Sequence, residues 1–156
     1  MGNIAALPQS QRDGYRYALN SDHFVWLVSN LCKGHGIRIE PSFLLQNFRP
    51  PHDREQLVDA IHACGLRAGL LRVDGEDLKY SLLPVIAFPR PIVSSNKATD
   101  TPPPGLIVIV TNDRLLYVEA GSNAPRFRMK RNFLEFFEPT VVLGTRPADR
   151  ELSPSR

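Results

Sequence analysis

The chain has 156 residues, of which 42% are hydrophobic and 22% are charged, and its formal net charge is +3. This length and composition predict one globular domain, and so small a net charge does not indicate nucleic acid as a partner. No apolar run is long enough to span a membrane, and the start of the chain has no charged and apolar leader, so we expect a cytosolic domain. Cys32 and Cys64 lack the spacing of a metal site and are expected to be buried, reduced thiols, with no metal or other cofactor.

The first part of the chain has helical patterns. Residues 20–36 place apolar side chains three and four positions apart and predict an amphipathic helix. Ser21 or Asp22 is its expected cap, and Gly34 or Gly36 its expected stop. A short helix is expected over PSFLLQNF, which opens with a proline, and another from D-R-E-Q, a capping-box pattern, to CG.

The pattern after CG changes to short runs of aliphatic and β-branched residues. These runs predict strands, and the turn residues T-N-D-R make two of them antiparallel neighbours. Short helices are expected around GEDLKYSL and RNFLEFF, and residues 89–104, rich in Pro, Ser and Thr, are expected to form a mobile loop. The expected strands are RAGLLRV, PVIAF, GLIVIV, RLLYVE, RFRMK and TVVLG.

Helices followed by an antiparallel sheet is the order of papain-like folds. Six segments of the chain resemble, in sequence and spacing, the double-glycine leader peptidase family at the amino end of bacterial ABC exporters. They are REQLVDAIHACGLRAGLL, EDLKYSLLPVIAF, GLIVIV, LLYVEAG, NFLEFF and TVVLG. The resemblance covers residues 17–144, and its most specific parts are residues 60–66 and the L-x-x-x-L-L-P-V-I-A run at 78–87. It implies an α+β, papain-like fold with N-terminal helices packed on an antiparallel β-sheet. The domain would span 16–144, after a flexible N-terminus at 1–15 and before a linker toward a membrane domain at 145–156.

The resemblance also implies where catalytic residues would stand. In active members a glutamine, four residues, an aspartate and the nucleophilic cysteine open the first helix. Here Tyr17 stands at the glutamine, Asp22 matches the aspartate, and His23 stands at the cysteine. The catalytic histidine would open GLIVIV at Gly105 or a neighbour, and its orienting aspartate would fall at Glu119. The resemblance therefore implies a degenerate domain that is not an enzyme.

The chemistry of a helix start leads to the same expectation. The positive end of the helix dipole stabilises a thiolate but disfavours an imidazolium, so His23 is expected to be a neutral hydrogen-bonding group. Cys32 and Cys64 lie toward the carboxyl ends of their helices, where the dipole opposes thiolate formation. A cysteine peptidase that uses one of these two thiols in an altered geometry, to remove a leader peptide, stays open as an alternative.

Degenerate domains of this kind occur in type I secretion ABC transporters, notably exporters of haemolysin-like RTX proteins. The resemblance therefore implies a domain on the cytoplasmic face of the bacterial inner membrane that holds the unfolded substrate for export. Its other partners would be the membrane and nucleotide-binding domains of the same transporter. A second alternative is a regulatory domain that contacts the nucleotide-binding part and never touches substrate.

The candidate substrate-binding residues are His23, Tyr17, Trp26, Arg126, Arg128 and Lys130. The histidine either contacts substrate or only caps and packs, and the two aromatic residues either line a cleft or pack against the sheet. The three basic residues alternate with apolar ones in RFRMK, so we expect them on one face of a strand. That face would either meet an acidic, calcium-free RTX segment or be an ordinary solvated surface.

Overall fold

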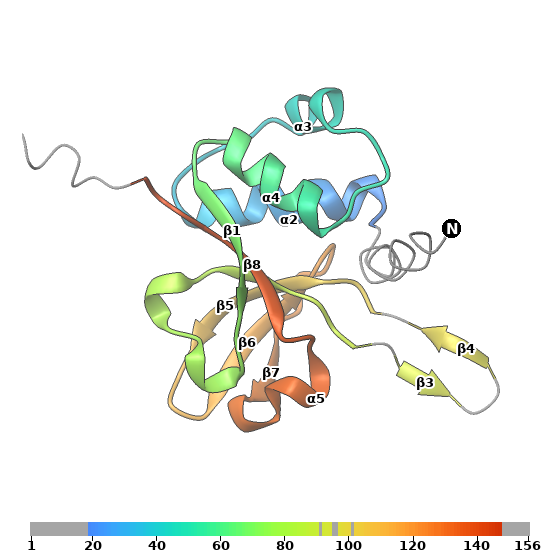
Figure 1. Cartoon of the computed structure of the whole chain (residues 1–156), viewed down its shortest axis with the longest axis vertical. Helices are drawn as coiled ribbons and strands as arrows, with labels where there is room; N and C mark the ends of the chain where they lie inside the picture. The colour runs from blue at the N-terminus through green and yellow to red at the C-terminus, as the bar shows by residue number, and fades with distance from the viewer. Residues whose placement is uncertain (1–18, 91, 95–96, 101, 148–156) are drawn as a thin grey trace, which may run out of the picture.

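Three α-helices begin the part of the chain that this computed structural model describes, residues 19–90, 92–94, 97–100 and 102–147. The predictions for residues 1–15, for Tyr17 and for the tail from residue 148 concern residues outside these ranges. Figure 1 shows the three helices grouped on one side of the sheet. They are α2 (Ser21–Gly34), α3 (Pro41–Asn47) and α4 (Arg54–Ala63), and all three were predicted.

The cap of helix α2 lies before the two residues that were expected to form it. Asn20 is the cap, and its side-chain oxygen accepts a hydrogen bond from the amide of His23 at 2.7 Å. Ser21 and Asp22 lie inside the helix, so the prediction that one of them caps it is wrong. Asparagine is as good a cap as serine or aspartate, and a sequence with three such residues in a row does not show which one is used. The predicted end at Gly34 is confirmed.

The second part of the chain forms an antiparallel sheet whose described strands lie in the order β1-β8-β2-β5-β6-β7. Each strand was predicted from its apolar run, and the hairpin at T-N-D-R is confirmed by the pairing of β5 with β6. Strands β1 and β7 are the two edges. The bounds are β1 (Arg67–Arg72), β2 (Val85–Ala87), β5 (Gly105–Val110), β6 (Arg114–Glu119), β7 (Arg126–Met129) and β8 (Thr140–Thr145).

The segment 89–104 differs from its prediction. Strands β3 (Ile92–Ser94) and β4 (Lys97–Asp100) pair antiparallel and form a separate two-stranded sheet. The prediction of a loop throughout this segment is therefore wrong. Figure 1 shows this hairpin extending away from the main sheet. Ile92, Val93 and Thr99 are β-branched and favour an extended backbone, which outweighs the prolines that flank the segment.

Short helices connect the strands where the sequence predicted them. The segment GEDLKYSL forms two 3-10 helices rather than one α-helix, and RNFLEFF forms a 3-10 turn that continues into one α-helical turn. They are η1 (Gly75–Asp77), η2 (Tyr80–Leu82), η3 (Lys130–Asn132) and α5 (Phe133–Phe136). Single turns are common where a chain must reverse between strands, because few residues then need helical bonding.

The sheet separates two hydrophobic clusters. Phe24 and Leu31 of α2 pack with Leu106 of β5 on the face that the helices cover. Tyr117 of β6 packs with Phe133 of α5 on the opposite face. Because neighbouring residues of a strand point to opposite faces, residues one position apart in β5 or β6 belong to different sides of the molecule.

Candidate functional site

His23 lies in the first turn of α2, beside the turn that follows β6. Gly121 forms part of that turn with a φ of +82°, and a Cβ built on it would lie 3.6 Å from both Cδ2 and Nε2 of His23. The imidazole therefore packs against the backbone of the turn while remaining half-buried. An imidazole on a glycine turn thus occupies the position where the resemblance expects a nucleophile.

Glu119 and Gly105 pair across β6 and β5, but the side chain of Glu119 does not face His23. It lies on the sheet face opposite the helices, where its Oε2 is 3.8 Å from Nη1 of Arg126. The structure therefore brings His23 to Gly121, two residues past Glu119, and leaves the carboxylate on the other side of the sheet.

Gly105 has no room for a side chain. A Cβ at this position would lie 2.2 Å from the carbonyl oxygen of Val118 and 2.8 Å from the Cα of Glu119. Both obstacles are backbone atoms of the paired strand, so a histidine here requires β6 to move. In this chain the backbone of β6 fills the space that a side chain at position 105 would occupy.

Sequence reasoning missed His52, which is fully buried between α2 and α4. Its ring stacks on Phe24 with centroids 4.1 Å apart and planes 10° apart. Its Nε2 lies 3.0 Å from the hydroxyl of Ser21, and its Nδ1 is hydrogen-bonded to the side-chain oxygen of Gln56. His52 thereby links the start of α2 to the first turn of α4.

Gln56 fixes the direction of its hydrogen bond with His52. Its Nε2 donates to the carbonyl of Arg49 at 2.8 Å, so its Oε1 accepts from Nδ1 of His52. The other ring nitrogen, Nε2, forms its hydrogen bond with the hydroxyl of Ser21, which can either donate or accept. The predicted capping box is consequently half formed: Asp53 accepts from the amide of Gln56 at 2.9 Å, whereas the Gln56 side chain serves His52.

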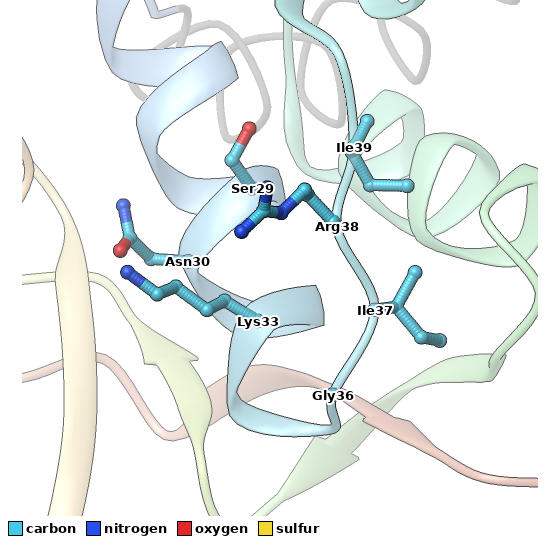
Figure 2. A pocket seen from close by; sticks show the side chains of 7 residues that line it. All are labelled: Ser29, Asn30, Lys33, Gly36, Ile37, Arg38 and Ile39. Atoms are coloured by element: carbon cyan, nitrogen blue, oxygen red, sulfur yellow. The ribbon is translucent and has the colours of Figure 1, made fainter.

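Trp26 is half-buried and packs against the hydrophobic cluster on the helix side. An open hollow of about 470 Å³ lies further along the chain, between the second half of α2 and residues 36–39. Figure 2 shows the side chains of Lys33 and Arg38 beside this hollow. Its lining residues are Ser29, Asn30, Lys33, Gly36, Ile37, Arg38 and Ile39.

Arg126 and Arg128 lie together, on the sheet face opposite the helices. They border a hollow of about 280 Å³ with Glu119, and the guanidinium carbon of Arg128 is 4.7 Å from the ring centroid of Phe136. A guanidinium over an aromatic face is held by cation–π attraction, which keeps the charge at the mouth of the hollow. The remaining lining residues are Pro89, Arg90, Pro102, Tyr117, Glu135 and Phe137.

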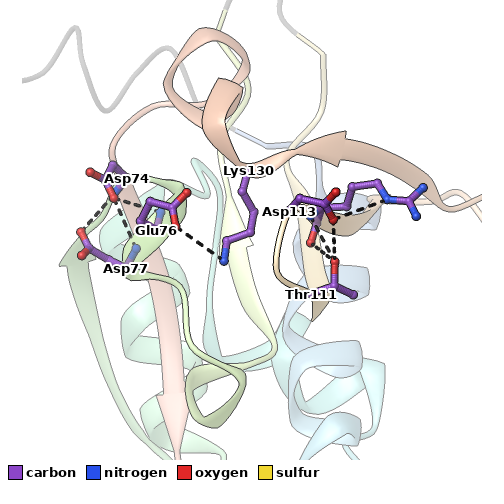
Figure 3. Close-up of polar contacts among 7 residues, drawn as sticks. Asp74, Glu76, Asp77, Thr111, Asp113 and Lys130 are labelled. Carbon is purple, nitrogen blue, oxygen red and sulfur yellow. Dashed lines mark hydrogen bonds and ion pairs between the residues drawn. The ribbon is translucent and has the colours of Figure 1, made fainter.

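Lys130 does not share an exposed face with these arginines, so the predicted three-residue basic face is wrong at this position. Strand β7 ends at Met129, and Lys130 opens η3, where strand alternation no longer applies. The residue is only 9% exposed, and its Nζ lies 3.9 Å from Oε1 of Glu76 (Figure 3). A buried ammonium needs such a partner because it has lost most of its water.

The two cysteines meet at the opposite end of α2 from His23. Both are free thiols, Cys32 is fully buried, and Cys64 caps the end of α4. A hydrogen bond between the two thiols, together with burial, raises the pKa of Cys32, and the same hydrogen bond lowers the pKa of Cys64. The expected position toward the helix ends is confirmed, whereas the expectation that both thiols are buried is wrong for Cys64, which is half-buried. Neither thiol adjoins the start of α2.

Alkylation by iodoacetamide at neutral pH is expected to modify Cys64 and to spare Cys32 in the folded chain. Cys64 is partly accessible and has the lowered pKa, whereas Cys32 is fully buried with a raised one. Intact-mass measurements over time, on the chain and on the Cys64→Ser variant, provide the check. Rapid modification of Cys32 in the folded variant would contradict this account and favour a thiol enzyme.

Within the described ranges, no group of three or more His, Cys, Asp or Glu side chains is arranged to hold a metal ion. In the same ranges, no helix combines the length and apolar character that crossing a membrane requires.

No protein-family model and no curated protein sequence matches the chain. Its fold is that of peptidase C39-like domains of ABC transporters, which confirms the predicted α+β, papain-like architecture. One similar structure is the N-terminal peptidase C39-like domain of the toxin secretion ATP-binding protein from Vibrio parahaemolyticus. It has a TM-score of 0.61 and 15% identity, and the match covers 81% of this chain and 98% of that one.

A second similar structure is the peptidase domain of Streptococcus ComA, a bifunctional ABC transporter involved in quorum sensing. Its TM-score is 0.59 at 14% identity, over 84% of this chain and 99% of that one. At such identities the likeness establishes the fold, while the chemistry of the site depends on the residues of this chain.

Proposed function

We propose that this chain is a non-catalytic, peptidase-like domain of a type I secretion ABC transporter. It holds an unfolded secreted protein of the RTX kind on the cytoplasmic face of the bacterial inner membrane. The observation that carries the proposal is the imidazole of His23 against Gly121, in a C39-like fold, where a peptidase needs a thiolate at the start of the helix. The similar structure from a toxin secretion protein supports the setting of protein export.

Three features of the site support the loss of catalysis. His23 carries an imidazole and cannot supply the thiolate nucleophile that a cysteine peptidase needs at this position. Gly105 has no space for a general base. The carboxylate of Glu119 is paired with Arg126 on the opposite side of the sheet and therefore cannot orient a base beside His23.

Substrate contact is assigned to two surfaces. The first surface is the start of α2, where His23 and Trp26 are half-buried, with Tyr17 as a further proposed contact. The second surface carries Arg126 and Arg128; the charge of Arg126 is shared with Glu119, and the guanidinium of Arg128, beside the ring of Phe136, suits an aspartate-rich chain. An unfolded chain loses conformational entropy on binding, so the dissociation constant is expected to be micromolar or weaker, on the order of other small transient interfaces. Weak binding also allows release into the transporter.

Calorimetric titration with an aspartate-rich RTX segment tests this function. We expect binding without calcium, when the segment is unfolded, and none after calcium has folded it. Affinity should fall as salt rises, and the Arg128→Gln variant should show a smaller salt dependence than the control Arg67→Gln, which changes an exposed arginine on β1. Absence of binding in both calcium states would remove the holding function and favour a regulatory contact within the transporter.

A further inference from the structure

Strand β7 offers an open edge for a further strand. It pairs with β6 on one side and with none of the described strands on the other. The pairing places Arg128 opposite Leu115 and Phe127 opposite Leu116. An edge of this kind presents main-chain hydrogen-bonding groups that an extended polypeptide can use.

The register shows which groups face outward. The amide of Lys130 donates to the carbonyl of Asp113 at 2.9 Å, and hydrogen-bonded pairs alternate with non-bonded pairs along an antiparallel ladder. Phe127 and Met129 therefore direct their N–H and C=O groups away from β6. In agreement with this, Nη1 of Arg128 donates to the outward carbonyl of Phe127 at 3.3 Å, a contact that an added strand would share or replace.

The side chains beside this edge are mostly cationic and aromatic, with the carboxylates of Glu119 and Glu135 also lining the hollow and Glu119 pairing with Arg126. Arg126 and Arg128 border the 280 Å³ hollow on one face. Phe127 is 57% exposed on the other face, where the guanidinium carbon of Arg114 lies 5.2 Å from its ring centroid. Arg131, just beyond the strand, is exposed as well. No acidic residue occurs within β7 itself.

We infer that β7 binds an extended segment of an acidic, unfolded polypeptide as an additional strand of the sheet. This inference rests on the proposed function and specifies how the domain holds its substrate. Main-chain hydrogen bonds give affinity that does not depend on sequence, so one edge can hold successive segments of an exported chain. Alternate side chains of the added strand fall over the arginines of the hollow and over Phe127, and carboxylates are favoured at the first of these places.

The opposite edge of the sheet provides a matched control. On β1, the amide of Val73 donates to the carbonyl of Pro139 at 2.7 Å, so by the same alternation the N–H of Leu70 faces outward. Leu70 and Leu71 are exposed there, and the strand lacks the hollow and the facing arginine pair of β7. Loss of the outward donor on β1 should therefore leave acidic chains bound.

The experiment compares backbone donors at the two edges. Met129 has a φ of −78°, which proline adopts, and it follows an extended residue, so Met129→Pro removes one outward N–H without breaking the ladder. Met129→Leu changes the side chain and keeps the donor, and Leu70→Pro removes the donor at β1. The probe is reduced, carboxymethylated α-lactalbumin, a permanently unfolded acidic chain, with calcium-loaded folded α-lactalbumin as the negative control.

Met129→Pro is expected to weaken binding of the unfolded probe about tenfold, because it loses a main-chain hydrogen bond and obstructs its neighbour. For Met129→Leu and Leu70→Pro, the affinity for the unfolded probe should stay within about twofold of that of the unaltered chain, because neither variant loses an outward donor of β7. Thermal unfolding verifies that each variant is folded. Independently of any variant, hydrogen exchange at the amides of Phe127 and Met129 should slow when the probe binds.

The outcomes separate this inference from the proposed function. If the probe binds equally well to Met129→Pro, and the amides of β7 keep their exchange rates, strand addition is wrong while the holding function stands. An equal loss in Leu70→Pro and Met129→Pro would also overturn the assignment to β7. If the unaltered chain binds no unfolded probe, the holding function itself fails, and the inference fails with it.

Discussion

Replacing His52 with alanine is expected to lower the free energy of unfolding by about 4 kcal/mol, toward the upper end of single-residue effects. The substitution removes a fully buried ring that stacks on Phe24. It also leaves the Ser21 hydroxyl and the side-chain oxygen of Gln56 without the partner that joins α2 to α4. Both partner groups are half-buried, so most of the expected cost comes from the loss of the buried ring and its packing. Chemical denaturation with urea measures the change.

Two variants serve as controls for His52. Ser21→Ala removes one hydrogen bond and should cost about 1 kcal/mol. His62→Ala changes an exposed histidine on α4, and its free energy of unfolding should lie within about 0.5 kcal/mol of that of the unaltered chain. If His52→Ala costs no more than His62→Ala, His52 does not link the two helices in the way the structure indicates.

Gly105→Ala is expected to destabilise the domain by about 3 kcal/mol or more, or to prevent its folding. The new methyl group would meet the Val118 carbonyl at 2.2 Å and the Cα of Glu119 at 2.8 Å, and neither backbone atom can rotate away. Gly69→Ala on β1 is the matched control, because a Cβ there has no atom within 4 Å outside its own chain neighbours. Denaturation of both variants gives the comparison.

A stable Gly105→Ala variant would mean that β6 yields at this point. The position could then accept a larger side chain, and one reason for proposing a non-catalytic domain would be lost. A large cost at Gly105 beside a negligible one at Gly69 would instead show that close strand pairing, rather than glycine as such, keeps a catalytic histidine out of this position.

Much of the architecture was predictable because it depends on local periodicity. Apolar residues three and four apart define α2, and short β-branched runs between turn residues define the strands. The strand pair at 92–94 and 97–100 was missed because its serines and the prolines on either side of it are typical of a loop, although its β-branched residues favour an extended backbone. The histidine before α4 was missed because its partners, Ser21 and Gln56, lie 31 residues before it and four after it, and only packing brings the first of them near.

The candidate site was predictable as positions along the chain but not as an arrangement in space. Sequence order places Glu119 near the end of β6, yet the side of the sheet that it faces depends on register, and β5 changes register between Ile107 and Ile109. Lys130 shows the same limit, because one residue more of β7 would have kept it beside Arg128, whereas the start of η3 buries it against Glu76.

An NMR titration of the isotopically labelled chain tests the holding function most directly. The ligand is an aspartate-rich RTX segment, added once without calcium and once after calcium has folded it. We predict chemical-shift changes only in the calcium-free titration, at the start of α2 around His23 and Trp26 and along β7. Equal shifts with the folded segment, or no shifts in either titration at concentrations well above micromolar, would contradict a domain that holds unfolded substrate.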